Sequence, residues 1–329
     1  MKTLVSIILP YRNAAPFLAQ AIASVERQRI PFWKLLLIDD HSTDEGRGIA
    51  EQAAANDKRI LNLRSPAGEA GAAAARNLGL RHATGDYVAF LDADDLLFPD
   101  KLETEISLME RFPEIGMTWG ATRWWYPGQE YRNWSDCPRR LAGRVHKPPS
   151  LLNSALLLQD THVPSLCGIM VRRAAIPEEP AFEPGLELYE DQSFIAKVLA
   201  HWPVYVGRHR TALYRQHAGS ASAQAETEGA YGRIGPHPAR SRFLAWVRAY
   251  IDRTPDLQRQ SGGALRIAGA IQSGDPSTLS VAEQRALVRR QLVKSATRPF
   301  AWAGGSLKRR LLQVIHWRNG ASDPLGRPL

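Results

Sequence analysis

Cysteine is almost absent from this sequence of 329 residues. The two cysteines, Cys137 and Cys167, are far apart in the chain, and neither has the partner of a CxxC motif. This pattern argues against a zinc site and against a disulfide framework. Such sparse cysteine is typical of free thiols in a reducing cytoplasm.

Long hydrophobic runs are also missing. The uninterrupted apolar runs are of strand length, such as residues 35–38, and Met1-Lys2 leads straight into a strand pattern without the architecture of a signal peptide. We therefore expect a cytoplasmic protein with no export signal and no membrane span. With 44% hydrophobic residues, the chain is long enough to bury one large α/β domain with appended elements.

Acidic residues are scarce in the C-terminal part of the chain. Residues 281–329 contain ten lysines and arginines but two acidic residues, so nearly all of the net charge of +9 belongs to this segment. Because the charge is confined to the tail and no recognised nucleic-acid-reading motif accompanies it, the sequence argues against nucleic-acid binding.

Strand and helix patterns alternate over the first 120 residues. The apolar periodicity predicts strands over 4–9, 34–38, 59–63 and 87–91, with helices around 17–25, 49–55 and 70–83. This alternation predicts a doubly wound, mostly parallel sheet. Residues 120–220 are more irregular, and we expect them to complete the sheet and wall a cleft, with a strand at 203–206 and a helix at 191–201.

Two acidic clusters follow predicted strands directly: Asp39-Asp40, and the DADD sequence of residues 92–95. Ligands of parallel sheets bind beyond the carboxyl ends of the strands. Although about fifty residues separate the two clusters, we expect them to lie on one edge of the sheet. The sequence therefore predicts a site there.

The DADD sequence places the carboxylates of Asp92, Asp94 and Asp95 within four residues. So much negative charge needs compensation, and Mg²⁺ or Mn²⁺ with a diphosphate supplies it, because these ions prefer carboxylate, phosphate and water oxygens. The alternative is that one aspartate caps a helix beginning near Pro99. We favour the metal, because a cap needs one aspartate and not three.

Other polar residues allow two interpretations each. Asp39-Asp40 can accept hydrogen bonds from a pyrimidine N–H or a ribose hydroxyl, or the segment can simply cap the next helix through Ser42 or Asp44. Arg76 can hold a phosphate or orient Asp92, or it is a solvent-facing helix charge.

The same ambiguity applies to two residues later in the chain. Glu190-Asp191 begins an amphipathic helix, where acidic residues favour the positive end of the helix dipole, but a carboxylate there can also act as a general base. His217 is a surface histidine or a ligand for Mn²⁺.

Six segments in this order resemble the inverting glycosyltransferases of family 2, which have the GT-A fold. They are SIILPYRN (6–13), LLIDDHSTD (36–44), GAAAARNLGL (71–80), GDYVAFLDADD (85–95), ED (190–191) and YRQHAGSAS (214–222). Each is weak alone, but together they are highly specific and cover residues 3 to about 225. His41 departs from the family, which usually has glycine there; the turn stays possible, but the base pocket is changed.

The resemblance implies an α/β fold of the GT-A type: a Rossmann-like nucleotide-binding domain whose mostly parallel central sheet is flanked by helices, with a helical C-terminal extension. It implies that a sugar moves from a nucleotide-diphosphate donor, a UDP-sugar, to a hydroxyl of a glycan or lipid-linked acceptor. Direct displacement with one base and no covalent nucleophile would invert the anomeric centre.

The resemblance also assigns roles to individual residues. The nucleotide site comprises the backbone near Pro10 and Tyr11, then Arg12, Asp39 or Asp40, Arg76, Asp92 at the ribose, and Ala93. Asp94, helped by His217, would bind the Mn²⁺ or Mg²⁺ that bridges the diphosphate. Asp191 would be the base, and the supporting residues would be Glu190, Asp95 and Asn77.

Two rival functions remain. A sugar nucleotidyltransferase would want a glycine-rich phosphate loop after the first strand, and Pro10-Tyr11-Arg12-Asn13 lacks the glycines. A non-catalytic protein that binds nucleotide sugars would have no need of the base.

The resemblance divides the chain into a catalytic domain at 1–225 and a mainly helical, basic extension at 226–329. In the extension we predict helices over 240–252 and 281–318, joined by a linker at 261–277 that contains glycine, serine and proline. Within 303–318, an apolar stripe beside basic residues is either an interfacial helix that contacts anionic membrane peripherally or a helix docked on the catalytic domain.

Three tryptophans in the middle region also allow two interpretations. Trp124, Trp125 and Trp134 either stack on an acceptor sugar or pack as part of the aromatic core.

Overall fold

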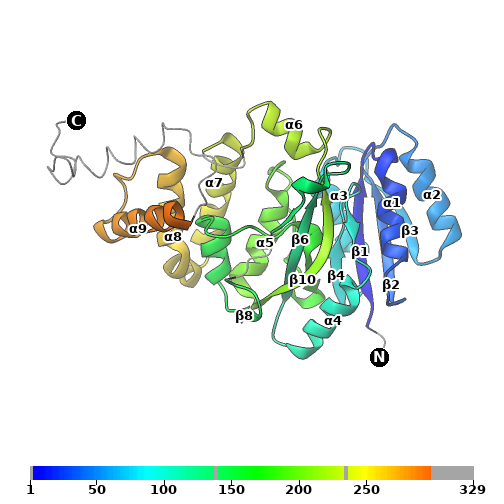
Figure 1. The fold of residues 1–329 in the computed structure, drawn as a ribbon, viewed down its shortest axis with the longest axis horizontal. Coiled ribbons are helices and arrows are strands. Elements are labelled where there is room, and N and C mark those ends of the chain that lie inside the picture. The colour runs from blue at the N-terminus through cyan, green and yellow to red at the C-terminus, as the bar shows by residue number, and fades with distance from the viewer. Residues whose placement is uncertain (1–2, 137–139, 233–235, 298–329) are drawn as a thin grey trace. The chain divides into compact units, whose positions relative to one another are not determined.

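The computed structural model describes residues 3–136, 140–232 and 236–297 (Figure 1). The chain divides into two compact units, residues 1–278 and residues 279–329. The larger unit contains the sheet and every residue to which the sequence assigns chemistry.

The first half of the larger unit alternates strands and helices as predicted. Its elements are β1 (Val5–Tyr11), α1 (Ala15–Glu26), β2 (Trp33–Asp39), α2 (Gly46–Asn56), β3 (Ile60–Arg64), α3 (Ala72–His82) and β4 (Tyr87–Phe90). The four strands pair in parallel in the order β3-β2-β1-β4. Their carboxyl ends therefore meet at one edge, as the alternation predicted.

The second half extends this sheet with mixed pairing. Its strands are β5 (Leu96–Leu97), β6 (Met117–Trp125), β7 (Trp134–Ser135), β8 (Arg144–His146), β9 (Ile169–Arg172) and β10 (Val204–Arg215). The sheet continues from β4 in the order β9-β6-β10-β5. β9 is antiparallel to both β4 and β6, whereas β6 and β10 are parallel. The parallel pairing that the sequence indicates is therefore interrupted by β9.

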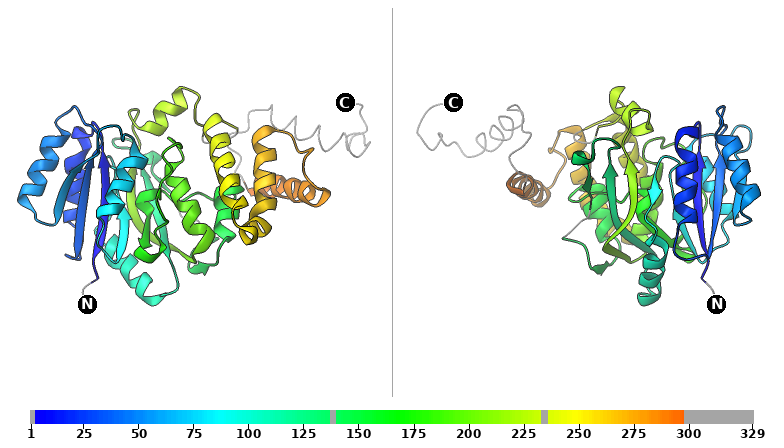
Figure 2. Two further views of the ribbon diagram at one scale, coloured as in Figure 1. Left: turned by 180° about the vertical axis from the view of Figure 1, so that it is seen from behind. Right: turned by 45° about the vertical axis from the view of Figure 1, so that its right-hand side comes forward.

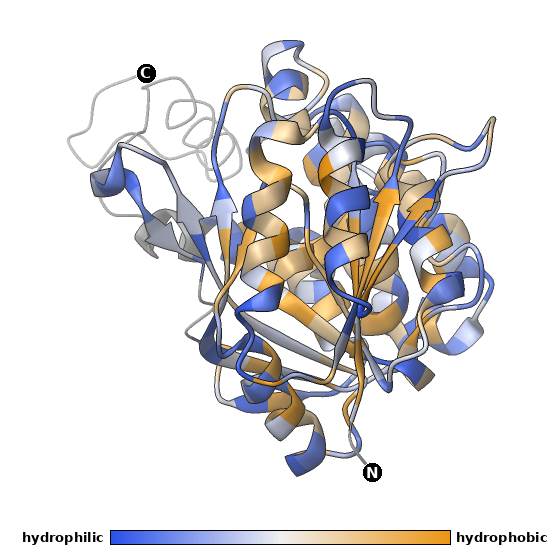
Figure 3. Ribbon diagram, turned by 90° about the vertical axis from the view of Figure 1, so that its right-hand side faces the viewer, coloured by the Kyte–Doolittle hydropathy of each residue, from blue (hydrophilic) through white to orange (hydrophobic). Residues whose placement is uncertain are grey.

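Helices cover both faces of the sheet (Figure 2). Alternate residues of β1, such as Ile7 and Leu9, join one buried cluster with α1, α2 and α4 (Lys101–Arg111). On the other face, α3 approaches β1 so closely that a side-chain Cβ at Gly79 would lie 2.5 Å from Ile8. Phe194 of α5 (Glu190–His201) packs on Phe90 of β4 on this second face. In Figure 3 several strands of the sheet accordingly have the orange colour of apolar residues, whereas others are pale or blue.

Helical segments complete the larger unit. They are a π-helix (Leu152–Leu157), α6 (Ala221–Thr227), α7 (Pro238–Asp252) and α8 (Pro255–Ser273). The prediction of a linker at 261–277 is wrong, because most of that segment belongs to α8. Its buried residues Leu257, Ser261, Leu265 and Ala268 recur at helical spacing, and α8 packs against α7. Gly274, with φ of 73°, ends the helix in the left-handed conformation that glycine adopts without strain.

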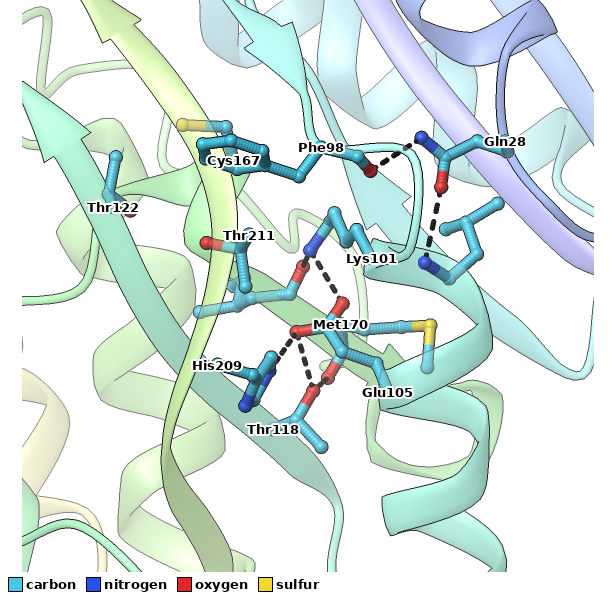
Figure 4. A network of polar contacts seen from close by, with 12 residues as sticks. Gln28, Phe98, Lys101, Glu105, Thr118, Thr122, Cys167, Met170, His209 and Thr211 are labelled. Carbon is cyan, nitrogen blue, oxygen red and sulfur yellow. Dashed lines mark hydrogen bonds and ion pairs between the residues drawn. The ribbon is translucent and has the colours of Figure 1, made fainter. Parts of the chain in front are cut away.

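A buried polar network ties α4 to three strands (Figure 4). Lys101 Nζ lies 2.5 Å from Glu105 Oε2 and donates to the carbonyl of Ile169. Thr118 Oγ1 donates to Glu105 Oε1, and His209 Nε2 lies 3.5 Å from the same oxygen. Burial raises the pKa of Glu105, but Lys101 and His209 more than offset this and lower it. The network fixes the middle of β10, whose end reaches the candidate site.

The smaller unit contains α9 (Val281–Thr297). The predicted helix over 281–318 is therefore helical as far as residue 297, and the segment 303–318 lies outside the described residues. Peripheral membrane contact through that segment stays a prediction. Within the described part of the chain, no helix is both long enough and apolar enough to cross a bilayer.

Candidate active site

The candidate site lies where β1, β2 and β4 end. Tyr11 and Asp39 are paired in register at the ends of β1 and β2, and the amide of Leu91, just after β4, donates to the carbonyl of Ile8. The site thus brings together segments 10–13, 39–44 and 91–95, as the sequence predicted from the strand ends.

Asp39 and Asp40 have different hydrogen-bond partners. Asp39 is 2% exposed, and its Oδ1 accepts a hydrogen bond from the amide of Ser42, so it shapes the turn after β2. Both carboxylate oxygens of Asp40 accept the amide N–H of Gly71 at 3.0 Å, at the start of α3. Arg12 lies 3.8 Å from Asp40. Of the two aspartates, Asp40 is the one beside Arg12.

Tyr11 contributes its backbone at this edge. Its side chain is buried, and its hydroxyl donates to Asn62 Oδ1 at 3.0 Å. Burial, and next the charge of Asp39, raise the pKa of the Tyr11 hydroxyl. The side-chain hydroxyl of Tyr11 is therefore engaged within the protein, and the nucleotide contact expected at Pro10-Tyr11 stays a prediction.

The turn after β2 explains the glycine that the family usually has at position 41. His41 has φ of 58°, in the left-handed region that costs glycine nothing and that histidine tolerates better than most residues. Its Nε2 lies 3.0 Å from the carbonyl of Glu69. The turn is therefore retained, with an imidazole added beside the segment that leads into α3.

Asp94 and His217 meet although they are far apart in sequence. His217 Nε2 lies 2.9 Å from Asp94 Oδ2, and both side chains are partly exposed. Burial, and then the charge of Asp92, raise the pKa of Asp94, whereas the hydrogen bond with His217 lowers it. A carboxylate crowded in this way gains from a nearby cation.

Asp94 and His217 fit a cation that they would share with a bound diphosphate. Within the described ranges, no three His, Cys, Asp or Glu side chains are grouped as a complete metal site. Asp94 and His217 can supply an oxygen and a nitrogen ligand, which suits Mn²⁺, and a bound diphosphate and water would have to supply the rest.

Asp95 has a different role from its neighbours. It is fully buried, and its Oδ1 accepts the amide N–H of Arg215 at 2.8 Å. Burial raises the pKa of Asp95 well above its usual value, and the charges of Asp94 and Asp92 add to this. This third carboxylate therefore joins the DADD turn to the end of β10.

Arg215 completes that connection, a role that was not predicted from the sequence. Its Nε donates to the carbonyl of Asp94 at 2.6 Å, and its guanidinium lies over the rings of Phe17 and Trp125. The available signal was its position two residues before His217.

Arg76 joins two segments of the site, the DADD turn and the start of α5. It is buried, and its guanidinium donates to Asp92 Oδ1 at 2.7 Å and to Glu190 Oε1 at 2.8 Å. Of the roles that the sequence left open, this geometry favours orienting Asp92 and argues against a solvent-facing helix charge. Glu190 is 114 residues away in sequence, and its pairing with Arg76 was not foreseen.

Asp191 follows Glu190 in the first turn of α5. The pKa of Asp191 is raised to about 7, first by burial and then by the charge of Glu190, while the charge of Arg76 opposes both. A carboxylate that titrates near neutral pH suits proton transfer, because it is both a competent acceptor and able to release the proton again.

Two other residues of the predicted site, Asn77 and Ala93, have contacts or burial that are typical of a structural role. Asn77 Nδ2 donates to the carbonyl of Phe182, and Asn77 Oδ1 accepts the amide of Phe182, so this residue fixes the segment before α5 to α3. Ala93 is buried within the DADD turn. Asn77 thus supports the position of Glu190 and Asp191 indirectly.

Replacing Arg76 with methionine should lower the free energy of unfolding by about 3 kcal/mol, because the largely buried Glu190 and the partly exposed Asp92 lose the buried guanidinium that they share. Urea unfolding would measure this. Arg81→Met on the same helix is the control, since Arg81 is more exposed and its ion pairs are 3.7 and 3.9 Å long. Equal stability of the two variants would contradict a buried bridge.

Family comparison agrees with this geometry. Residues 6–178 match the model of glycosyl transferase family 2. The chain belongs to this family. A glycosyltransferase of Haemophilus influenzae is 44% identical over 106 residues, which cover 32% of this chain and 42% of that protein.

Two further relatives are informative. The Escherichia coli protein named UDP-Glc:alpha-D-GlcNAc-diphosphoundecaprenol beta-1,3-glucosyltransferase WfgD is 42% identical over 106 residues, which cover 32% of this chain and 41% of that protein. The crystal structure of S. aureus TarS with UDP-GlcNAc superimposes with a TM-score of 0.61 at 16% identity, covering 87% of this chain and 79% of that one. The predicted GT-A fold is thereby confirmed. The chain matches less than half the length of these two curated relatives.

Proposed function

We propose that this family 2 chain transfers a sugar from a UDP-sugar to a hydroxyl of a glycan or lipid-linked acceptor, with inversion at the anomeric carbon. The observation that carries the proposal is the single cluster formed by Asp94 with His217 and by Arg76 with Asp92 and Glu190, next to Asp191. This cluster offers a cation site on one side and a proton acceptor on the other.

The relatives support the choice of donor and acceptor. TarS was crystallised with UDP-GlcNAc, and WfgD is named for a UDP-Glc donor and a diphosphoundecaprenol-linked acceptor. Since the chain covers part of WfgD, these names support a class of substrates, a UDP-sugar and a lipid-linked saccharide, for the proposal.

The donor would bind beyond the carboxyl ends of β1, β2 and β4. Arg12 and Asp40 would meet the base, with main-chain atoms of Pro10 and Tyr11. Asp92, held by Arg76, would meet the ribose, with Ala93 beside it. Asp94 and His217 would hold Mn²⁺ or Mg²⁺, which when bound supplies positive charge to the departing nucleoside diphosphate.

The acceptor step needs one proton transfer. The acceptor hydroxyl gives its proton to the carboxylate of Asp191 while its oxygen forms a bond to the anomeric carbon. The bond from that carbon to the diphosphate breaks on the opposite side, which inverts the centre. Arg76 keeps Glu190 neutralised, so that Asp191 is less hindered from being ionised at neutral pH.

Two rival functions are less well supported. A nucleotide-sugar-binding protein without activity has no use for a carboxylate whose pKa is raised to about 7 beside the donor site. A nucleotidyltransferase would need a glycine-rich loop after β1, where this chain has Arg12 and Asn13.

Calorimetry with UDP, GDP and CDP tests the donor half of the proposal. We expect UDP to bind in the presence of Mn²⁺, to lose affinity in EDTA and to regain it when excess Mn²⁺ is added. A panel of UDP-sugars should then show slow donor hydrolysis. Binding that is unchanged in EDTA would reject the cation site, and binding without any turnover of the panel would favour the inactive rival.

A further inference from the structure

The three tryptophans near the end of β6 have separate environments. The guanidinium carbon of Arg215 lies over the ring of Trp125, 4.4 Å from the ring centroid. Trp124 meets the edge of Tyr214 and stacks on Trp134, with ring centroids 5.0 Å apart. Trp134, in β7, is 38% exposed. Of the three, Trp134 is therefore the most exposed.

The surroundings of Trp134 add a second exposed ring. His162 lies at 5.3 Å from Trp134, centroid to centroid, and is tilted by 47°. Partial desolvation by its neighbours lowers the pKa of His162, which favours the neutral form of its imidazole. Tyr131, three residues before Trp134, is 87% exposed. Trp134 and His162 thus form an exposed pair of rings, and exposed aromatic side chains of this kind are typical of a binding surface.

The backbone around Trp134 is held firmly. Asn133 Oδ1 accepts the amide of Tyr126, and Asp136 Oδ1 accepts the amide of Thr122 at 2.7 Å. β7 is also paired with β6 through Trp124 and Trp134. A ring that is fixed before binding loses little entropy when a ligand stacks on it.

This aromatic cluster is continuous with the candidate active site. Tyr214, which contacts Trp124, precedes Arg215, whose amide donates to Asp95. Burial, and then the charges of Asp95 and Asp92, raise the pKa of the Tyr214 hydroxyl. Trp124 and Tyr214 therefore connect Trp134 to the end of β10, where the backbone of Arg215 bonds to Asp95, so a ligand on Trp134 would be removed from the reacting centre.

We infer that Trp134 forms a subsite for a sugar ring of the acceptor beyond the ring whose hydroxyl reacts, so that the acceptor is an oligosaccharide chain. This inference rests on the proposed glycosyl transfer. A pyranose presents an apolar C–H face that packs on an aromatic ring, and its hydroxyls suit the polar edge of a neighbouring imidazole such as His162. Trp134 would thus distinguish longer acceptors from single sugars.

Calorimetry of the full chain with chitotriose, cellotriose, maltotriose and their monosaccharides tests this inference. We expect at least one trisaccharide to bind about tenfold or more tightly than its monosaccharide, and Trp134→Ala to remove that difference. Trp134→Phe should keep most of it. Phe32→Ala is the matched control, because Phe32 is 36% exposed and lies just before β2, at the opposite end of that strand from Asp39.

UDP binding with Mn²⁺, measured in parallel, separates this inference from the proposed function. We expect Trp134→Ala to bind UDP as the native protein does. Trisaccharide binding that survives in Trp134→Ala would overturn the subsite, and so would the failure of every trisaccharide to bind the native protein. Loss of UDP binding in the native protein, with trisaccharide binding still dependent on Trp134, would reject the donor site and retain the sugar subsite.

Discussion

Replacing Asp191 with asparagine should reduce sugar transfer by about 10²–10⁴-fold, the usual contribution of a general base, and leave Mn²⁺-dependent UDP binding nearly unchanged. The amide has the shape of the carboxyl group but cannot accept the proton of the acceptor hydroxyl. A turnover assay with a UDP-sugar, alongside calorimetry with UDP, would show the split. Glu187→Gln, an exposed carboxylate in the segment before α5, is the control. Normal turnover by Asp191→Asn would refute the assigned base.

The pH profile of the native protein gives an independent check of the same residue. The pKa of Asp191 is raised from its ordinary value to about 7, so the group is largely protonated at pH 6 and ionised at pH 8. Since a base must be ionised to act, kcat/KM should rise with pH through about 7 and fall about tenfold per pH unit well below it. This limb should be absent from the residual activity of Asp191→Asn. A flat profile between pH 5.5 and 8 would contradict the assignment.

Replacing Asp94 with alanine should weaken both UDP binding in Mn²⁺ and turnover. Groups that merely position metal ligands are worth about 10–100-fold in metal affinity, so loss of a direct carboxylate ligand should cost at least this much. In EDTA the variant and the native protein should bind UDP alike. Calorimetry with and without Mn²⁺ measures the difference.

The control for Asp94→Ala is Asp100→Ala. Asp100 precedes α4, and its side chain makes no capping hydrogen bond there. If Asp94→Ala bound UDP and Mn²⁺ as tightly as Asp100→Ala does, the cation would have to lie elsewhere.

The meeting of the acidic clusters could be predicted because it follows from parallel strands. Asp40 and Asp94 each come just after a strand, and neighbouring parallel strands end at one edge.

The pairing of side chains across the site could not be predicted in the same way. Arg76 meets Glu190 because α3 and α5 pack on one face of the sheet, and no local pattern reports that contact. Asp95 stands in the same motif as Asp94, and its burial against Arg215 depends on where β10 ends. The helix α8 was missed because its small residues, which permit close packing against α7, have the composition of a linker.

The guanidinium of Arg76 thus pairs with Asp92 on the proposed donor side of the site and with Glu190 on the proposed acceptor side. Arg76 also opposes the rise in the pKa of Asp191, so a shift of this guanidinium away from Glu190 would raise that pKa further and leave less of the Asp191 carboxylate ionised at neutral pH. Under the proposed mechanism, the position of one side chain would therefore set how much of the base is able to accept a proton.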